Sequence, residues 1–539
     1  MQRYRADVVI AGGGIAGIVA AIDLLAQGKS VLLLDRDAEE NFGGLAKESF
    51  GGILLVDTPM QRRQGVKDSP ELALSDWLSF GAFGPDEGAR DFPRRWAEAY
   101  IANTGPDIHD YLKGFGIGFL PMPLWVERGL YGEGNSVPRW HVVWGTGHVL
   151  ATRLIEVLRG HANSDKLTLK FGHRVERIET AAGRATGVSG VTEESGAAFR
   201  AEGDCVVVAA GGINGDIARV KANWHADWGR PPETILNGSH KYADGLVHDA
   251  AVAHGARLTH LDRMWNYAAG VRHWRPRKPG HGLSLVPPRS ALWLDRSGAR
   301  IGPMPLVSGF DTRDLVTQIC AREGGYSWQV LNRKIALKEL AVSGAEFNPH
   351  VRNRNFPGFL RDTLFGNHWL YGELTKNCPD IVVADTLPEL VDKMNGLQGD
   401  DAVRLATISA EIARYDAGID RGPATHNDEQ LRRIAHLRRW KADRLRVCKF
   451  QKIIDKGAGP LMAIREFIIS RKSLGGIRTD LSSRVVDGVD QPLPGLYAIG
   501  EAAGFGGGGM NGLRGLEGTF LGGCIYSARR AARTIGAGA

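Results

Sequence analysis

The sequence predicts an α/β protein in which a dinucleotide-binding domain is interrupted by an inserted α+β domain. Residues 6–17, ADVVIAGGGIAG, form a short apolar stretch that runs into glycines. Apolar stretches at 206–212 and 494–504 end in glycines as well. Between 262 and 454 the chain changes to proline- and arginine-rich loops and helical segments without such motifs. The expected boundaries are 1–261 and 455–539 for the interrupted domain and 262–454 for the inserted, substrate-capping domain.

The first motif has the features of a mononucleotide-binding βαβ unit. Gly12, Gly14 and Gly17 fill the GxGxxG positions after a strand, and a helix is expected from Ile15 to Gly28. The next strand, SVLLLDR, ends in Asp35, a carboxylate placed to accept hydrogen bonds from ribose hydroxyls. An ordinary glycine-rich turn is the alternative interpretation. The residues assigned to dinucleotide binding here are Gly12, Gly14, Ala16, Gly17, Asp35 and Arg36.

Other elements follow from local patterns. PELALSDWLSF, residues 70–80, predicts a helix, and the alternation at 168–180 predicts one strand. Residues 242–256 predict a turn and helix with Asp244 near the N-cap. In the inserted domain, 389–397 and 429–445 are expected to be helical. The basic run at 432–446 is interpreted as a solvated helix face, with a binding patch as the alternative.

Composition excludes several classes of function. The chain has 539 residues, and its formal net charge of +7 is spread along the sequence, so no nucleic-acid partner is expected. Five cysteines lie far apart without CxxC spacing, which gives no case for a zinc site, an iron–sulfur cluster or attached haem. No apolar run reaches the length of a membrane span. A strand starting at residue 6 leaves no room for a signal peptide, so a cytoplasmic location is expected.

The glycine motifs together indicate the cofactor. GGLAKESFGG at 43–52, VVVAAGG at 206–212 and PGLYAIGEAAG at 494–504 complete a set that resembles the two-dinucleotide-fold flavoproteins. The resemblance implies FAD, and without a second GxGxxG unit NAD(P)H is not expected as a second resident cofactor. It also implies a backbone contact from Val175 to the adenine, with a plain strand as the alternative. The further expected cofactor residues are Gly43, Gly44, Ser49, Gly51, Gly52, Val175, Ala210, Gly211, Gly500, Glu501, Gly515 and Leu516.

As a whole the chain resembles the fumarate reductase/succinate dehydrogenase flavoprotein superfamily, in the branch that contains the 3-ketosteroid dehydrogenases. The likeness is closest at residues 1–60, at GPLMAIREFIISRKSLGGIRTD and at PGLYAIGEAAG. Succinate dehydrogenase flavoproteins attach FAD through a histidine, but residues 41–52 contain none. The resemblance therefore implies non-covalent FAD.

The run GFGGGGMNGLRGLEGTFLGG at 504–523 is expected to lie at the flavin. Four successive glycines predict uncovered backbone amides and close approach of a planar ring. A helix is expected from near Gly515, with its N-terminus facing the pyrimidine edge of the flavin. A mobile glycine linker is the alternative.

Four residues are expected to act in catalysis. Arg514 is the strongest candidate, because a guanidinium beside the glycine loop is a fixed donor; bonding to loop carbonyls is the structural alternative. By glycine spacing, Asn511 occupies the slot of a ketosteroid dehydrogenase tyrosine. Lys472 stands near a fumarate reductase histidine position and suits an anion. Tyr267 is a candidate acid/base, with core packing as the alternative, and His273 and Lys472 are weaker candidates.

The resemblance implies an oxidoreductase that forms or reduces a C–C double bond next to a carbonyl. An apolar cyclic ketone or steroid-like substrate is favoured, because the fumarate reductase histidine is missing. The alternatives are a reductase of an unsaturated carboxylic acid and a non-catalytic flavin-binding redox sensor. Electrons are expected to pass to or from an external carrier, such as a quinone, a dye-like carrier or oxygen. The sequence leaves the oligomeric state open.

Overall fold

The computed structural model describes residues 1–129, 132–302, 305 and 309–538, and the chain folds as two compact units. Unit 1 comprises residues 1–223, 239–265 and 472–539, and unit 2 comprises residues 224–238 and 266–471. The boundary expected after residue 261 lies close to the one after Trp265. The chain returns to unit 1 at Lys472, later than the expected 455, and residues 224–238 also belong to unit 2.

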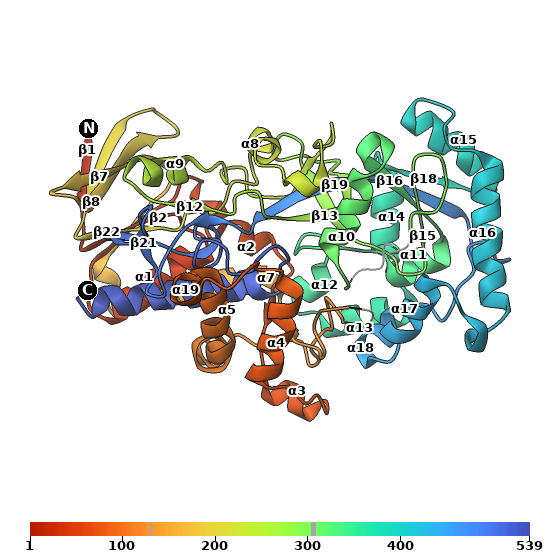
Figure 1. Ribbon diagram of the computed structural model, residues 1–539, viewed down its shortest axis with the longest axis horizontal. Coiled ribbons are helices and arrows are strands. Elements are labelled where there is room, and N and C mark those ends of the chain that lie inside the picture. The colour runs from red at the N-terminus through yellow and green to blue at the C-terminus, as the bar shows by residue number, and fades with distance from the viewer. Residues whose placement is uncertain (130–131, 303–304, 306–308, 539) are drawn as a thin grey trace. The chain divides into compact units, whose positions relative to one another are not determined.

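Unit 1 is built on a six-stranded sheet with the order β21-β22-β10-β2-β3-β6. The five strands β22, β10, β2, β3 and β6 pair in parallel, and β21 is antiparallel to β22. Red N-terminal and blue C-terminal segments therefore share one sheet (Figure 1). The strands are β2 Val8–Ala11, β3 Val31–Leu34, β6 Leu167–Lys170, β10 Cys205–Val208, β21 Arg484–Val486 and β22 Pro492–Ala498.

Three helices pack together beside this sheet. Helix α1, Ile15–Ala26, connects β2 to β3 and contacts both α7, Thr146–Arg159, and α19, Thr519–Gly536. The strand expected at 168–180 is in fact two strands in different sheets, because the chain turns at Gly172 with φ +66°. The second sheet has the order β1-β9-β8-β7, with β1 Gln2–Arg5, β7 His173–Ala181, β8 Arg184–Thr192 and β9 Ala198–Glu202.

Shorter elements complete unit 1. Asp244 Oδ1 accepts from the Leu246 N–H at 3.0 Å at the start of α9, although Gly245 is the N-cap residue. The helix expected at 70–80 is confirmed as α4, capped by Ser69. These elements are α2 Gly44–Glu48, β4 Gly52–Leu54, α3 Pro59–Arg63, α4 Pro70–Gly81, α5 Phe92–Asn103, α6 Asp110–Gly114, β5 Trp140–Val142, α8 Ile217–Ala222, α9 Leu246–Ala253, β12 Leu258–Thr259 and β20 Gly476–Ile477.

Unit 2 contains an eight-stranded sheet, which confirms the expected inserted α+β domain. Its path is β15-β16-β19-β13-β14-β17, and β11 and β18 also pair with the long strand β19. The strands are β11 Leu236–Asn237, β13 Met264–Arg272, β14 Gly282–Val286, β15 Leu292–Leu294, β16 Tyr326–Asn332, β17 Ala341–Val342, β18 Ile381–Ala384 and β19 Leu461–Ser473.

The helices of unit 2 include both expected segments. Residues 389–397 lie within α15, whereas 429–445 form two helices, α17 and α18, because Arg438–Trp440 leave the helical path. The helices are α10 Thr312–Cys320, α11 Arg333–Glu339, α12 Pro349–Arg352, α13 Phe356–Phe365, α14 His368–Asn377, α15 Leu387–Gln398, α16 Leu405–Asp420, α17 Glu429–Leu437 and α18 Lys441–Arg446.

A buried acid lies in the middle of this sheet. Glu466 of β19 is 0% exposed, and Ser327 of β16 lies opposite it in the antiparallel register. Neither Glu466 carboxyl oxygen has a hydrogen-bond partner within the described part of the chain. Burial raises the pKa of Glu466 well above its usual range, which favours the protonated form of this carboxyl group.

Candidate functional site

The GxGxxG turn has the close packing that its glycines predict. Gly12 has φ +120°, and a Cβ there would lie 2.3 Å from the Ala209 carbonyl oxygen. A Cβ on Gly17 would lie 2.0 Å from the Gly12 carbonyl oxygen, so α1 approaches β2 only because this position is glycine. Ala16 of α1 is buried, and a Cβ on Gly500 would lie 2.9 Å from its methyl group.

The N-terminus of α1 is open to a ligand. Its N-cap residue, Gly14, offers no side-chain hydrogen bond, and a Cβ there would have nothing within 4 Å. Gly43 and Gly44 border this place: the Gly43 N–H donates to Gly13 O at 3.1 Å, and a Gly44 Cβ would lie 3.5 Å from the Gly14 Cα. Amide groups and the dipole at such a helix end suit a diphosphate.

Asp35 and Arg36 follow the end of β3: Asp35 accepts backbone hydrogen bonds, whereas Arg36 forms ion pairs. The Asp35 carboxylate accepts from the Gly13 N–H at 2.6 Å and from the Asp37 N–H at 2.7 Å. Burial raises the pKa of Asp35. Arg36 pairs with Glu193 at 2.6 Å and with Asp244 at 2.5 Å, so its guanidinium joins three segments of unit 1.

The segment 49–52 packs against aromatic and helical neighbours. A Cβ on Gly52 would lie 1.7 Å from the Trp140 Nε1, and one on Gly51 would lie 2.5 Å from the Gly147 backbone N. The Ser49 hydroxyl donates to Ala46 O at 2.7 Å, and Ser49 O accepts from the Gly147 N–H. Close packing alone therefore requires glycine at positions 51 and 52, whether or not a cofactor binds there.

The other strand ends provide further backbone positions. Val175 pairs with Gly190, and the register then shifts between Val175 and Arg177, which is a β-bulge of the kind found beside binding sites. Ala210 and Gly211 follow β10, and Gly211 has φ +80°.

Gly500 and Glu501 connect the end of β22 to its surroundings. The Gly500 N–H donates to the Ser527 hydroxyl at 2.9 Å, and Gly500 has φ +62°. The Glu501 carboxylate accepts from the Ser473 N–H at 2.9 Å and lies next to Gly212. Glu501 therefore contacts both the loop that follows β10, at Gly212, and the last residue of β19, Ser473.

The four-glycine run does not have the uncovered amides that we expected. All four N–H groups donate within the protein: Gly507 to the Thr479 hydroxyl at 3.0 Å, and Gly506, Gly508 and Gly509 to carbonyls of the same loop. The four φ angles lie between +67° and +154°. A Cβ at Gly506 would lie 2.5 Å from the Trp96 ring, so the glycines allow a buried, left-handed turn.

The last helix begins at Thr519, four residues after the expected start near Gly515. Gly518, in the left-handed conformation, is its N-cap, and the Leu516 carbonyl accepts from the Thr519 hydroxyl at 2.6 Å. Gly515 lies among rings instead, because a Cβ there would be 2.8 Å from Phe520 and 3.2 Å from Trp265.

Asn511 presents an unused donor in this segment. Its side chain is 0% exposed, and Oδ1 accepts from the Thr519 hydroxyl at 2.7 Å. The Asn511 Nδ2 has no hydrogen-bond partner among the described residues, and so remains available as a donor.

Arg514 is placed by backbone bonds from two sides. The Leu513 and Arg514 N–H groups both donate to the Gly81 carbonyl, at 2.7 and 3.0 Å. Three residues on, the Glu517 N–H donates to the buried Glu127 carboxylate at 3.0 Å. Sequence reasoning missed Gly81 and Glu127, because hundreds of residues separate each of them from its partner.

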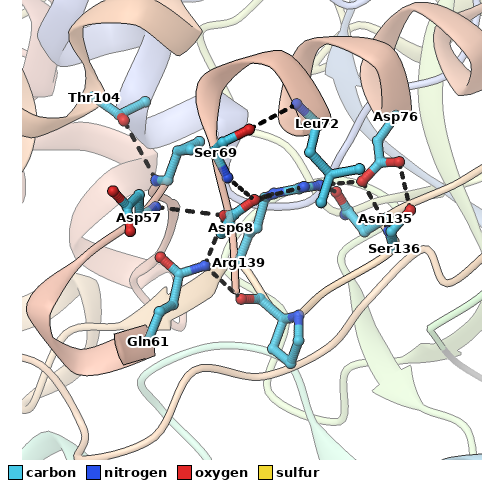
Figure 2. Close-up of polar contacts among 12 residues, drawn as sticks. Asp57, Gln61, Asp68, Ser69, Leu72, Asp76, Thr104, Asn135, Ser136 and Arg139 are labelled. Atoms are coloured by element: carbon cyan, nitrogen blue, oxygen red, sulfur yellow. Dashed lines mark hydrogen bonds and ion pairs between the residues drawn. The ribbon is translucent and has the colours of Figure 1, made fainter. Parts of the chain in front are cut away.

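A buried ionic network holds the helix that ends at Gly81. Figure 2 shows Arg139, which is 1% exposed, between the carboxylates of Asp68 and Asp76. Arg139 Nη2 donates to Asp68 at 2.8 Å and Nη1 donates to Asp76 at 2.5 Å. Asp76 also accepts from the Ser136 N–H and hydroxyl at 2.8 and 2.6 Å. Through Asp76 the network fixes α4, and α4 in turn provides the Gly81 carbonyl.

Lys472 and two aromatic residues meet the same C-terminal segment. The Lys472 Nζ lies 4.1 Å from the centroid of the Phe520 ring, and the Trp265 ring centroid lies 5.5 Å from that of Phe520. A cation over a ring face is favourable. Unit 1 therefore brings Lys472, Gly515 and Trp265 together.

Tyr267 and His273 belong to unit 2. Tyr267 lies in β13, half-buried, with the Arg471 guanidinium 5.7 Å from its ring centroid. His273 is buried, with the His281 ring centroid 4.5 Å away and Glu346 3.5 Å from its Nε2. That environment indicates a structural role for His273.

Sequence reasoning also missed His260. A Cβ on Gly509 would lie 2.8 Å from its Cδ2 atom, and the neighbouring Thr259 hydroxyl donates to Gly508 O at 2.8 Å. Burial lowers the pKa of His260 to about 4, so the ring is neutral near pH 7. The surrounding sequence LTHLD has no motif that points to this contact.

Within the described ranges, no group of three or more His, Cys, Asp or Glu side chains could hold a metal ion. None of the described helices is both long and apolar enough to cross a membrane.

Comparison with known proteins gives full-length matches. A family described as FAD binding domain matches residues 7–521. A KsdD-like steroid dehydrogenase of Mycobacterium tuberculosis is 40% identical over 552 residues, which cover 99% of this chain and 96% of the relative.

Solved structures share the fold. A 3-ketosteroid delta1-dehydrogenase from Sterolibacterium denitrificans has a TM-score of 0.69 and 17% identity, covering 99% of this chain and all of its own. An open flavocytochrome c3 fumarate reductase has a TM-score of 0.67 and 17% identity, covering 99% of this chain and 78% of its own.

Proposed function

The chain belongs to the FAD binding domain family, and from this premise we propose that it is a ketosteroid dehydrogenase-like enzyme acting on a steroid-like cyclic ketone. FAD is the cofactor, and the reaction class is oxidation or reduction of a CH–CH group. The observation that carries the substrate proposal is the 40% identity, over nearly the whole chain, to a KsdD-like steroid dehydrogenase. An external carrier would exchange electrons with the enzyme.

The residues of unit 1 suit FAD. The open N-terminus of α1 at Gly14, bordered by Gly43 and Gly44, would hold the diphosphate. Asp35 would accept from the adenosine ribose, and Glu501 would bond to cofactor hydroxyls. Ala16, Gly17 and Gly500 keep this region compact. Four other assigned contacts, Val175, Ala210, Gly211 and Leu516, would act through their backbones.

Arg514 and Asn511 are proposed to hold the substrate carbonyl. Bound FAD supplies the acceptor or donor of a hydride at one carbon of the reacting C–C bond. Removing a proton from the neighbouring carbon places negative charge on the carbonyl oxygen. The Arg514 guanidinium and the Asn511 Nδ2–H are donors suited to that oxygen, and neither can act readily as a base.

Tyr267 is proposed as the acid/base group, because a phenol can donate or accept the proton at the neighbouring carbon. Lys472 is proposed to add positive charge near the C-terminal segment, where it lies over the Phe520 ring.

A reductase of an unsaturated acid is the second candidate. The observation that favours it is that Lys472 lies over the Phe520 ring, and Gly515, which follows Arg514, packs against the same ring. A carboxylate needs such cationic partners. A redox sensor without turnover is the third. The large second unit, with its own eight-stranded sheet, favours an enzyme over a sensor.

Anaerobic flavin reduction in stopped flow tests the proposal. We expect ketosteroids to bleach the flavin, and simple dicarboxylates to leave it unchanged. Arg514→Ala should slow reduction by about 10²–10³-fold, as loss of one oxyanion donor does in other enzymes. Arg514→Lys should also be slow, because it keeps the charge and loses the planar fork.

The matched control is Arg63→Ala, which removes an exposed arginine of α3 in the same unit. Normal reduction by Arg514→Ala would contradict its catalytic role. Loss of FAD or a lower melting temperature in that variant would instead show a structural role. Return of the yellow colour when an unsaturated acid is added to the reduced flavin, with no response to ketosteroids, would favour the second candidate.

A further inference from the structure

Unit 2 exposes a group of large apolar side chains on two consecutive helices. Phe356, Leu360, Leu364 and Phe365 of α13 and Trp369 of α14 are between 43% and 75% exposed. These five residues lie within fourteen positions of the sequence. Leu445 of α18 is 51% exposed, and α18 lies against α13. We call these six residues the apolar patch.

The patch is unusual for a helix of a folded domain. Phe356, Leu360 and Leu364 follow the i, i+4, i+8 spacing, so they share one face of α13. No residue of α13 is buried, so this helix does not direct an apolar stripe into the core, as a surface helix ordinarily does. Exposed apolar side chains gathered on one helix face in this way indicate an interaction site.

The chain next to the patch is rich in basic residues. Residues 429–449 contain eight Lys or Arg residues and two acidic residues, whereas the whole chain has a formal charge of +7. Lys441 and Arg444 are exposed and lie in the same short helix as Leu445. On α13 itself, Arg361 is 64% exposed and pairs with Asp362 at 3.1 Å. Figure 1 shows α13 and α18 next to each other.

We propose that the apolar patch and the basic residues of α18 dock the protein on an anionic phospholipid surface. Exposed Phe, Leu and Trp side chains enter the boundary between head groups and acyl chains, and neighbouring Lys and Arg attract anionic head groups. Under this proposal the basic run 432–446, interpreted from the sequence as a solvated helix face, lies against anionic lipid head groups.

Charge argues against a second copy of the chain as the occupant. A two-fold symmetric dimer through this patch would place the same surface of each copy against the other. The exposed Lys441 and Arg444 of each copy would then lie in the same interface, and like charges across an interface are unfavourable. An anionic lipid surface supplies the opposite charge and requires no matching shape.

Vesicle binding by the full-length, FAD-loaded protein tests the proposal. We expect co-flotation with vesicles of phosphatidylcholine mixed with phosphatidylglycerol, and little with phosphatidylcholine alone. High salt should weaken binding, because it screens exposed charges. Leu364→Ser/Phe365→Ser should reduce the partition coefficient, and Lys441→Glu/Arg444→Glu should reduce it at least about 25-fold, at about fivefold per cation removed.

Matched controls come from unit 1. Val489→Ser changes an apolar side chain that is 67% exposed, and Arg63→Glu/Lys67→Glu reverses two exposed charges. Both controls should bind vesicles as the unmodified protein does. All variants should keep their FAD content and flavin reduction rate, so failure here is distinct from failure of the proposed function.

Three results would overturn the proposal. The first is no binding to anionic vesicles. The second is equal binding by patch variants and controls. The third is an oligomer of the unmodified protein that Leu364→Ser/Phe365→Ser converts to monomer in light scattering, which would identify a second copy as the partner.

Discussion

Replacing Arg139 with methionine should destabilise unit 1 strongly, because two buried acids would lose their only guanidinium in the network of Figure 2. The side chains of Asp68 and Asp76 are 0% and 8% exposed, and both pair with Arg139. Breaking a buried ion pair by removing one partner costs about 3–5 kcal/mol. Gln61 and Ser136 still donate to these acids, so we expect a loss within that range.

Such a loss is large beside a typical stability of about 5–15 kcal/mol. Urea unfolding of the FAD-loaded protein, followed by flavin fluorescence and by circular dichroism, measures it. Two probes are needed because a chain with two units need not unfold in one step. We also expect slower flavin reduction in Arg139→Met, since α4 positions the Gly81 carbonyl that accepts from Arg514.

Arg62→Met is the matched control. Arg62 also makes two bonds to a carboxylate, at 2.8 and 2.5 Å from Asp57, but its side chain is 63% exposed. Solvent screens an exposed pair, so this change should leave the unfolding midpoint unchanged. If Arg139→Met and Arg62→Met unfold at the same urea concentration, the reasoning from burial is refuted.

Three further predictions concern the cofactor and the buried acid. Acid precipitation should release all flavin into the supernatant, because residues 41–52 lack a histidine; flavin in the pellet would show a covalent bond. Asp35→Ala and Glu501→Ala should each weaken FAD binding by about 1.5–3 kcal/mol in titrations, and unchanged affinity in both would exclude these contacts. Folding raises the pKa of Glu466 above its ordinary value near 4.3. The protonated group therefore contributes its full stabilisation below that ordinary pKa, and this stabilisation is lost as pH rises through the pKa of the folded state. Across that window the folding constant should fall by up to about tenfold per pH unit. Glu466→Gln should remove this slope from urea midpoints measured across pH, and an unchanged slope would assign it to other groups.

The first βαβ unit could be predicted in detail because its determinants are local. Gly12, Gly14 and Gly17 fix the turn and the start of α1 within a dozen residues, and Asp35 follows the next strand. The strand before each glycine motif is apolar on both faces, which is typical of a buried parallel sheet.

Where partners are distant in sequence, prediction failed. The amide of Gly507 is bonded by Thr479, and the conformation of the glycine run depends on Trp96 and His260. Nothing in GFGGGGMNG reveals these neighbours. The support of Arg514 by Gly81 and Glu127 likewise depends on contacts that only the folded chain creates.

The expected helix from Gly515 failed for a local reason. Gly518 adopts the left-handed conformation, with φ +98°, and this ends the preceding turn and starts α19 at Thr519. The segment 429–445 has a helical pattern throughout, yet it divides near Arg438–Trp440. Periodicity in the sequence does not detect such a break.

The left-handed turn at Gly506–Gly509 has a consequence for reading mutational scans of this protein. A side chain at any of the four positions would meet a neighbour within 3 Å as well as an unfavourable φ. Saturation mutagenesis will therefore record this stretch as intolerant to every substitution, alanine included. In an activity screen alone, that record would look the same as the record of a catalytic loop. Abundance measured in parallel separates the two, because these variants should disappear from the folded pool, whereas Arg514→Ala should stay in it.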